Sequence, residues 1–358
     1  MSKKHEGYKT RLTKRDITML MEMYQLQAIR ARDLVDVHFN GNRHGFDRLQ
    51  ELCARKYIER EFTVKDTGQR NCSVYNIADD GINVLFRLGE LGDISQPRRA
   101  RDNKLQTLEM LLRIEASKIA INIAKKGWQI KGGKDSKPQL SLSANSLTQM
   151  VLISPVKETY QVYVLNKNIQ DQTLTKLISE LGEIKHKSII LYKADNPMEQ
   201  TPAYKSIVNK ITGQDISKHE LCLIPMAELE EEERSRNFAI ESLSNSEENQ
   251  VEKYLQKRYG KIRYSDNRYH FGNIVVAQGG KEYMICNYLR RDQTVLRALS
   301  RNLTRSEYEN TGKGAIVLAW NAQVAEAQQI IDSYQKRDFI KVIGVTVKEI
   351  IDSQRENG

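Results

Sequence analysis

Apolar residues in the first part of the chain recur at helical spacing and then at strand spacing. Helical spacing runs through residues 13–28, again through 30–39 and a third time through 42–56. Residues 57–64 and 72–77 then alternate between apolar and polar, which predicts two strands joined by a polar turn. Three helices followed by a hairpin are typical of a winged helix-turn-helix, which we expect over residues 1–96.

The third predicted helix, 42–56, is the element that we expect to read DNA bases. Its inward side is predicted to carry Phe46, Leu49, Leu52 and Cys53. Its outward side is predicted to carry Asn42, Arg43, His44, Asp47 and Arg48. These polar residues gather in the N-terminal half, the part of a recognition helix that enters the major groove. Arg43 and Arg48 can pair with guanine and Asn42 with adenine. The alternative is an ordinary amphipathic helix with a solvated polar face.

Two further groups of polar and basic residues suit contacts with the DNA backbone. The turn between the two predicted strands carries Lys65, Gln69 and Arg70, placed to follow phosphates or to reach a minor groove. A basic patch at the start of residues 97–127 carries Arg98, Arg99, Arg101 and Lys104. We expect this patch to contact phosphates, although it is also what a solvated helix entry looks like. The long helix that follows, 103–126, either packs across the domain or forms the seam of a homodimer.

The quoted elements resemble a known family. The runs LTKRDITMLMEMYQLQAIRARDLVDVHF, HGFDRLQELCARKYIERE and DTGQRNCSVYNIADDGINVL, which lie within residues 12–85, resemble the replication-relaxation family. Its members are winged-helix proteins of plasmids and other mobile elements. The resemblance implies binding to double-stranded DNA in plasmid replication or DNA relaxation. The related MobC-type relaxases carry a restriction-nuclease-like catalytic domain, which would be degenerate here.

The rest of the chain repeats one order of elements. Strand, strand, helix, strand, helix, strand is predicted in 128–235 and again in 263–358, with an acidic, polar linker over 236–262. The repeats share the triplet Asp171-Gln172-Thr173 and Asp292-Gln293-Thr294 at the start of their first helix. This order resembles a restriction-endonuclease-like core, so the fold class is α+β: a winged helix-turn-helix, a long helix and two ββαβαβ domains.

Metal-dependent nuclease chemistry needs an acidic residue on one core strand and an acidic residue two before a Lys on the next. The predicted strands of both repeats lack this set: Glu158 falls in a turn, Glu282 begins a strand, and Lys167 has no acidic residue two before it. We therefore expect no catalytic residue, no metal and no cofactor in either domain. The alternative is a metal-dependent DNA nickase or relaxase.

Charge supports nucleic-acid binding by the N-terminal part. The chain carries a net charge of +10, and residues 1–132 hold 25 Lys and Arg against 17 Asp and Glu, which is +8 of that total. A basic excess confined to one region is the electrostatic footprint of phosphate binding. The four cysteines form no cluster, and no apolar run approaches the ~20 residues of a membrane span, which predicts a cytoplasmic protein with no membrane partner.

The sequence therefore predicts a sequence-specific, homodimeric double-stranded DNA-binding protein of a plasmid or other mobile element. Its role would lie in replication initiation, relaxosome assembly or transcriptional regulation, with other replication or relaxosome proteins as partners. A third hypothesis makes the C-terminal part a protein-interaction platform that uses the winged helix for docking.

Overall fold

The computed structural model describes residues 12–64, 72–92, 96–105, 107–183, 186–213, 220–229, 236–269, 271–333 and 338–355 of this mixed α+β protein. The chain divides into two units. The first holds residues 1–125 and 130–144, and the second holds residues 126–129 and 145–358. Residues 97–125 and 130–144 thus belong to the first unit, whereas the sequence predicted a separate linker with a long helix over 97–127 and a new domain from 128.

The first unit begins with a helix, a short strand, two helices and two further strands. In chain order its elements are α1 (Lys14–Leu26), β1 (Ile29–Arg30), α2 (Ala31–Phe39), α3 (His44–Ala54), β2 (Ile58–Val64), β3 (Cys72–Ile77), α4 (Asp79–Arg87), the 3-10 helix η1 (Ala100–Asn103), α5 (Thr107–Ala124) and α6 (Gly133–Gln139). Strand β4 (Gln129–Gly132) lies where the chain passes between the units. The helix predicted over 103–126 corresponds to α5, which lies within those bounds and follows η1.

Local sequence explains how these elements begin and where they pack. Thr13 caps α1, accepting from Asp16 N at 3.3 Å while the Asp16 carboxylate accepts from Thr13 N at 2.7 Å. The three strands form an antiparallel sheet in the order β1-β3-β2. Behind it, Ala28 and Val74 pack with Met110 and Ile114 of α5 in one apolar cluster.

The second unit contains two α/β halves with helices and short strands between them. The first half, residues 145–229, contains β5 (Met150–Ile153), β6 (Thr159–Leu165), α7 (Asp171–Glu183), β7 (Lys187–Lys193), α8 (Pro202–Gly213), β8 (Leu221–Met226) and β9 (Glu228–Leu229). Between the halves lie β10 (Arg236–Asn237), α9 (Phe238–Ser244) and α10 (Glu248–Tyr259). The second half, residues 263–355, contains β11 (Arg263–Tyr269), β12 (Gly272–Gln278), β13 (Lys281–Asn287), α11 (Gln293–Asn302), α12 (Arg305–Thr311), β14 (Lys313–Trp320), the 3-10 helix η2 (Asn321–Gln323), α13 (Val324–Ser333), β15 (Ile340–Val345) and α14 (Val347–Arg355).

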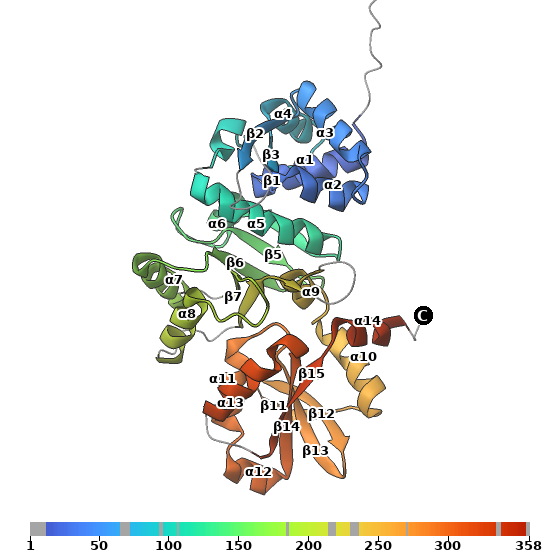
Figure 1. Cartoon of the computed structure of the whole chain (residues 1–358), viewed down its shortest axis with the longest axis vertical. Helices are drawn as coiled ribbons and strands as arrows, with labels where there is room; N and C mark the ends of the chain where they lie inside the picture. Colours follow the sequence, from blue (N-terminus) through green and yellow to red (C-terminus); the bar gives the residue numbers. More distant parts are fainter. Residues whose placement is uncertain are drawn as a thin grey trace, which may run out of the picture. The chain divides into compact units, whose positions relative to one another are not determined.

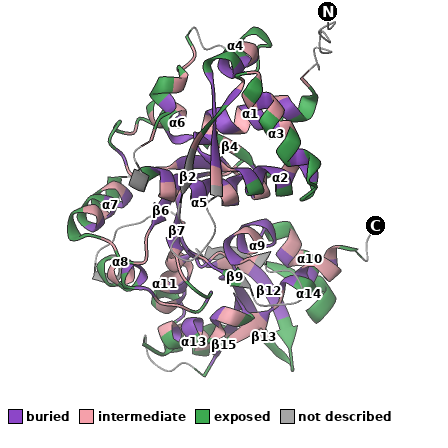
Figure 2. Ribbon diagram, turned by 45° about the horizontal axis from the view of Figure 1, so that its top comes forward, coloured by how far each residue is buried: buried purple, intermediate pink, exposed green. Residues whose placement is uncertain are grey.

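The sheets of the two halves share one pairing scheme. In the first half β5 pairs antiparallel with β6, and β6, β7 and β8 then run parallel. In the second half β11 pairs antiparallel with β12, β12 pairs antiparallel with β13, and β13, β14 and β15 run parallel. Strands β6 and β7 are buried along most of their length (Figure 2), and so is β14, as expected for parallel strands covered on both faces.

Helices cover these sheets. In the second half, α11 and α13 pack on one face of the sheet through Leu296, Leu299, Ala327 and Ile331, and α10 and α14 lie together on the other side (Figure 1). In the first half, Leu174, Leu177 and Leu181 of α7 pack on the sheet. The described residues include no helix that is both long enough and apolar enough to cross a membrane.

The interval 236–262, which the sequence predicted as an acidic linker, is instead part of the folded second unit. It forms α9 and α10, and Phe238, Leu243 and Leu255 are buried. Helix α9 begins at a cap in which Asn237 Oδ1 accepts from Ala239 N at 3.0 Å. The high charge of this stretch concealed its apolar positions, because charged residues on one side of a helix are compatible with burial of the other.

Candidate nucleic-acid interface

Helix α3 presents an exposed polar surface at its N-terminal half. Asn42, Arg43, His44 and Asp47 are exposed, as the sequence predicted for the outward side. The buried residues of α3 are Gly45, Leu49 and Leu52. Gly45 permits a close approach of α2, because a Cβ at this position would lie 2.9 Å from the Phe39 ring.

The start of α3 is fixed by short-range contacts. Asn42 Oδ1 accepts a hydrogen bond from His44 N at 3.0 Å, so the amide of Asn42 satisfies a free N–H of the first turn. The His44 ring meets the Phe39 ring edge-on, with centroids 6.3 Å apart. These contacts hold the exposed end of α3 in one orientation against α2.

Arg48 does not share the outward surface. Its Nε and Nη2 donate to the two carboxylate oxygens of Asp16 at 3.1 and 2.6 Å, and Nη1 donates to Glu51. Only 10% of the Arg48 side chain and 1% of the Asp16 side chain are exposed. Although burial of Asp16 favours its protonated form, the hydrogen bonds from Arg48 and Thr13 hold the pKa of Asp16 below its usual value. Arg48 therefore ties α3 to the start of α1.

Two residues of α3 that the sequence did not assign to this surface belong to it. Phe46, expected in the core, is 40% exposed, and Gln50 is exposed. Residues 46 and 47 follow residue 43 by three and four positions and precede residue 50 by four and three, which places all four on one side of a helix. The spacing of Gly45, Leu49 and Leu52 could have predicted the exposure of Phe46. These three residues form the buried stripe of α3, and Phe46, one residue after Gly45, points about 100° away from that stripe around the helix axis.

Basic residues of α1 lie next to this surface. Lys14 and Arg15 are exposed in the first turn of α1, and the Arg48–Asp16 ion pair joins that turn to α3. The Arg15 guanidinium lies over the Phe39 ring, 4.7 Å from its centroid. A cation held on an aromatic face keeps its N–H groups available at the rim, where a phosphate can accept from them.

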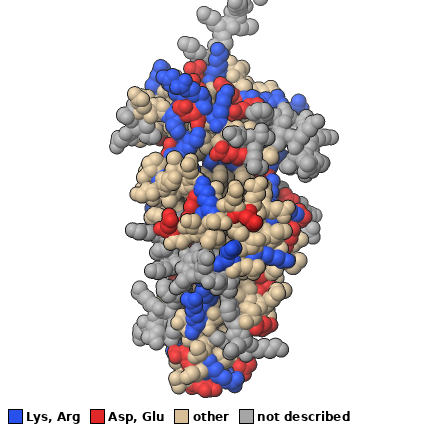
Figure 3. Space-filling model, turned by 90° about the vertical axis from the view of Figure 1, so that its left-hand side faces the viewer, with Lys and Arg blue, Asp and Glu red and all other residues tan. Residues whose placement is uncertain are grey.

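The predicted backbone-contact residues divide into three groups. Lys65, Gln69 and Arg70 lie outside the described residues. Arg99, Arg101 and Lys104 are exposed. Arg98 instead points into the first unit, where it donates to the Tyr24 carbonyl at 3.0 Å and to Asp135 at 2.7 Å, with its guanidinium 4.6 Å from the centroid of the Tyr24 ring. Figure 3 shows one face of the first unit on which Lys and Arg side chains gather, with some acidic residues among them.

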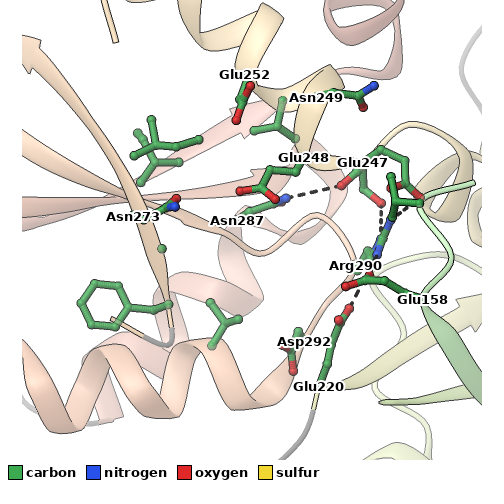
Figure 4. Close-up of a pocket in the computed structure, with 18 of the residues that line it drawn as sticks. Glu158, Glu220, Glu247, Glu248, Asn249, Glu252, Asn273, Asn287, Arg290 and Asp292 are labelled. Carbon is green, nitrogen blue, oxygen red and sulfur yellow. Dashed lines mark hydrogen bonds and ion pairs between the residues drawn. The ribbon is translucent and has the colours of Figure 1, made fainter. Parts of the chain in front are cut away.

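The second unit contains a cavity of about 990 Å³ between its two halves and α10. The charged and amide side chains that line it are Glu158, Lys187, Glu220, Glu247, Glu248, Asn249, Glu252, Asn273, Asn287, Arg290 and Asp292. Figure 4 shows Arg290 between the carboxylates of Glu247 and Glu158. Arg290 donates to Glu247 at 2.7 Å and to the Tyr160 hydroxyl at 2.6 Å. Several of the carboxylates are therefore already neutralised by cations of the same cavity.

Strands of the second half contribute uncharged side chains to this cavity. Asn273 of β12 and Ile285 and Asn287 of β13 line it, so these strands present amides and an alkyl group there. Glu282 lies at the other end of β13 and pairs with Arg263 and Lys313. In the first half, Glu158 pairs with Lys187. Within the described ranges, no three His, Cys, Asp or Glu side chains come together in a group that could hold a metal ion.

Asp292 is the most deeply placed carboxylate among these cavity-lining residues. It accepts hydrogen bonds from Leu221 N and Thr294 N, both at 2.9 Å, and 6% of the residue is exposed. Burial and the neighbouring Glu220 carboxylate raise the pKa of Asp292 to about 6. The residue joins the start of α11 to β8 of the first half.

Comparison with known proteins yields no match: neither a family model, nor a curated protein, nor a solved structure is similar to this chain.

Proposed function

We propose that the first unit is a winged helix-turn-helix that binds double-stranded DNA sequence-specifically through the exposed side of α3. The observation that carries this proposal is the row of exposed side chains at Arg43, Asp47 and Gln50, on a helix held rigidly against α1 and α2. Side chains with forked donors and acceptors on a projecting helix are the groups that read base edges in the major groove.

The architecture of the first unit supports this assignment. Its elements run helix, strand, helix, helix, strand, strand, and its sheet has the order β1-β3-β2, so that β2 and β3 form a hairpin beside α3. A hairpin in that place acts as a wing along the DNA backbone. The residues 65–70 that we assign to the wing tip include Lys65, Gln69 and Arg70.

Positive charge around α3 supplies the contacts that are independent of sequence. Lys14 and Arg15 stand beside α3, and Arg99, Arg101 and Lys104 are exposed elsewhere on the unit. Each Lys or Arg that neutralises a phosphate releases a counterion, which makes affinity fall steeply with salt. Arg98 drops out of this set because its Nη1 and Nη2 donate to partners inside the unit.

We assign the second unit a scaffold or dimerisation role. Its halves share one strand order and pairing scheme, which supports descent from a duplicated restriction-endonuclease-like core. Asn273, Ile285 and Asn287 support the loss of cleavage in the second half. With the resemblance of residues 12–85 to the replication-relaxation family, this favours a protein of a plasmid or other mobile element, acting in replication initiation, relaxosome assembly or transcriptional regulation.

The proposal is tested by measuring DNA binding of the full chain to a library of random-sequence duplexes, with selection of the bound fraction over several rounds. We expect one enriched sequence and an affinity that falls with salt. Arg43→Ala should weaken binding to the selected duplex by about 1–3 kcal/mol. Arg305→Ala is the matched control, because Arg305 is an exposed arginine of the second unit. Binding that does not depend on salt, or that both variants weaken alike, would contradict the proposal.

Arg48→Ala separates base reading from support of the helix. Because it leaves the buried Asp16 carboxylate without its guanidinium, we expect it to lower the unfolding free energy by about 3 kcal/mol. The sequence selected by any folded Arg48 variant should stay the same as that of the wild type. If Arg48→Ala instead lost the preference for one guanine and kept its stability, Arg48 would be a residue that reads a base.

Incubation of supercoiled plasmid carrying the selected sequence with Mg²⁺ or Mn²⁺ distinguishes binding from cleavage. We expect no nicking. Nicking that Glu158→Gln or Glu282→Gln abolishes would replace the scaffold role by a nickase.

A further inference from the structure

The outward side of α3 carries an aromatic ring among its polar groups. Phe46 is 40% exposed, with Arg43 one turn before it, Asp47 next to it and Gln50 one turn after it. None of the buried residues of α3, which are Gly45, Leu49 and Leu52, lies on that side of the helix. Along the helix axis, the ring therefore lies between Arg43 and Gln50 on the surface that we assign to DNA.

We infer that Phe46 is a specificity residue whose ring contacts the C5 methyl group of a thymine, and that Gln50 pairs with an adenine beside it. This inference rests on the proposed function and deepens it. In the major groove, thymine is the base that presents a methyl group, and an apolar side chain recognises it by excluding water from it. The Gln side-chain amide both donates and accepts, which matches N7 and the N6 amino group of adenine.

The spacing of these residues fits neighbouring base pairs. From Arg43 to Gln50 the helix rises by seven residues, or about 10.5 Å. Base pairs of B-form DNA lie about 3.4 Å apart along the axis, so this stretch spans about three of them. Phe46, between Arg43 and Gln50, then faces a base pair between those that the two polar side chains reach.

The charge on the same side of α3 indicates that this surface contacts base edges rather than phosphates. Asp47 is exposed next to Phe46, and a carboxylate there repels phosphates but accepts from the N4 amino group of cytosine. Lys14 and Arg15 at the start of α1 are instead placed to contact the phosphates of the DNA backbone. The centre of the surface is thus suited to base edges and its margin to phosphates, which is the division that base reading requires.

The test uses the duplex selected by the full-length wild-type protein, with each thymine replaced in turn by deoxyuridine, which lacks only the methyl group. For the wild type, one replacement should weaken binding about fourfold, the effect of one buried methyl group. Phe46→Ala should bind the thymine and the deoxyuridine duplexes equally. Phe86→Ala is the matched control, because Phe86 is a 43% exposed aromatic residue of α4, and it should keep the wild-type difference.

Gln50 is tested in the same way, with each adenine replaced by 7-deazaadenine, which lacks the N7 acceptor. One replacement should weaken wild-type binding severalfold and leave Gln50→Ala unaffected. If Phe46→Ala is poorly folded, Phe46→Gln is used instead, since an exposed site tolerates a polar side chain of this length.

Three results would overturn the inference. The first is wild-type binding that no deoxyuridine replacement changes, and the second is a Phe46 variant that keeps the thymine preference. In both, DNA binding itself persists, so the proposed function survives. The third is a chain that enriches no sequence and shows no salt-dependent binding, which overturns the proposed function together with the inference.

Discussion

The two halves of the second unit carry the same Asp-Gln-Thr triplet at the start of their first helix, but the Asp has a different environment in each half. Helix α7 begins at Asp171, which is exposed, whereas the cap of α11 is Asp292, which is buried against β8 of the first half. The shared Asp-Gln-Thr triplet thus starts a helix in both halves. Among the described residues, only the triplet of the second half also joins one half to the other.

The residues before the triplet explain this difference. Arg290 and Arg291 precede Asp292 and reach across to the first half, where Arg291 donates to the Tyr192 hydroxyl at 2.5 Å. Arg291 also pairs with Glu326, and 1% of its side chain is exposed. In the first half the equivalent positions, 121 residues earlier, hold the uncharged Ile169 and Gln170, and the nearby Lys167 makes an exposed pair with Asp195. When two similar halves pack together asymmetrically, only one of two equivalent loops can lie in the interface.

The largest expected effect is a difference in the free energy of unfolding between variants of the loop before Asp292 and variants of the loop before Asp171. Arg291→Ala leaves the buried Glu326 carboxylate without a cation, so we expect the unfolding free energy to fall by about 3–5 kcal/mol. Gln170→Ala, a change of the exposed residue directly before Asp171, should stay within about 0.5 kcal/mol of wild type. Urea unfolding followed by circular dichroism measures both. Equal losses of unfolding free energy would mean that the two loops contribute equally to stability.

A smaller effect depends on pH. Burial raises the pKa of Asp292 to about 6, above its value of about 3.9 in the unfolded chain. A raised folded pKa means that Asp292 favours folding fully below about pH 4, and that this contribution is lost as the pH rises through 6. The loss is on the order of 2–3 kcal/mol in wild type.

Asp292→Asn should remove this pH-dependent loss, because the amide keeps a cap for α11 and does not titrate. Asp171→Asn should retain it, because Asp171 is exposed. Urea midpoints between pH 4 and 7 compare the three proteins. The assignment is wrong if the Asp292 variant follows the wild-type profile across that range.

The smallest effect is expected at the exposed ion pair of the first half. Lys167→Ala should change the unfolding free energy by no more than about 0.5 kcal/mol, because surface pairs are weakened by solvent and salt. High salt should abolish even that change, while leaving the Arg291→Ala loss largely in place. A Lys167→Ala loss as large as that of Arg291→Ala would remove the contrast between the halves.

Periodicity alone located most of the regular elements. The helices over 13–28 and 42–56 and the paired strands of both halves were predicted because helical and strand spacings survive in the apolar residues of a single segment. It failed at Phe46, where an apolar residue was assumed to be buried, and at 236–262, where charge was taken as a sign of a linker. In both places the residue type was taken to indicate burial or exposure, whereas the position of the residue around the helix decides it.

The sequence by itself determined where most of the helices and strands form, and it determined that positive charge concentrates in residues 1–132, because both depend on neighbours along the chain. Only the tertiary structure decided that Arg43 faces solvent while Arg48 is paired. Arg48 and its partner Asp16 lie 32 residues apart, and Arg291 lies 35 residues from Glu326. Whether an arginine faces solvent or pairs with a buried carboxylate depends on such distant partners, which local spacing does not encode.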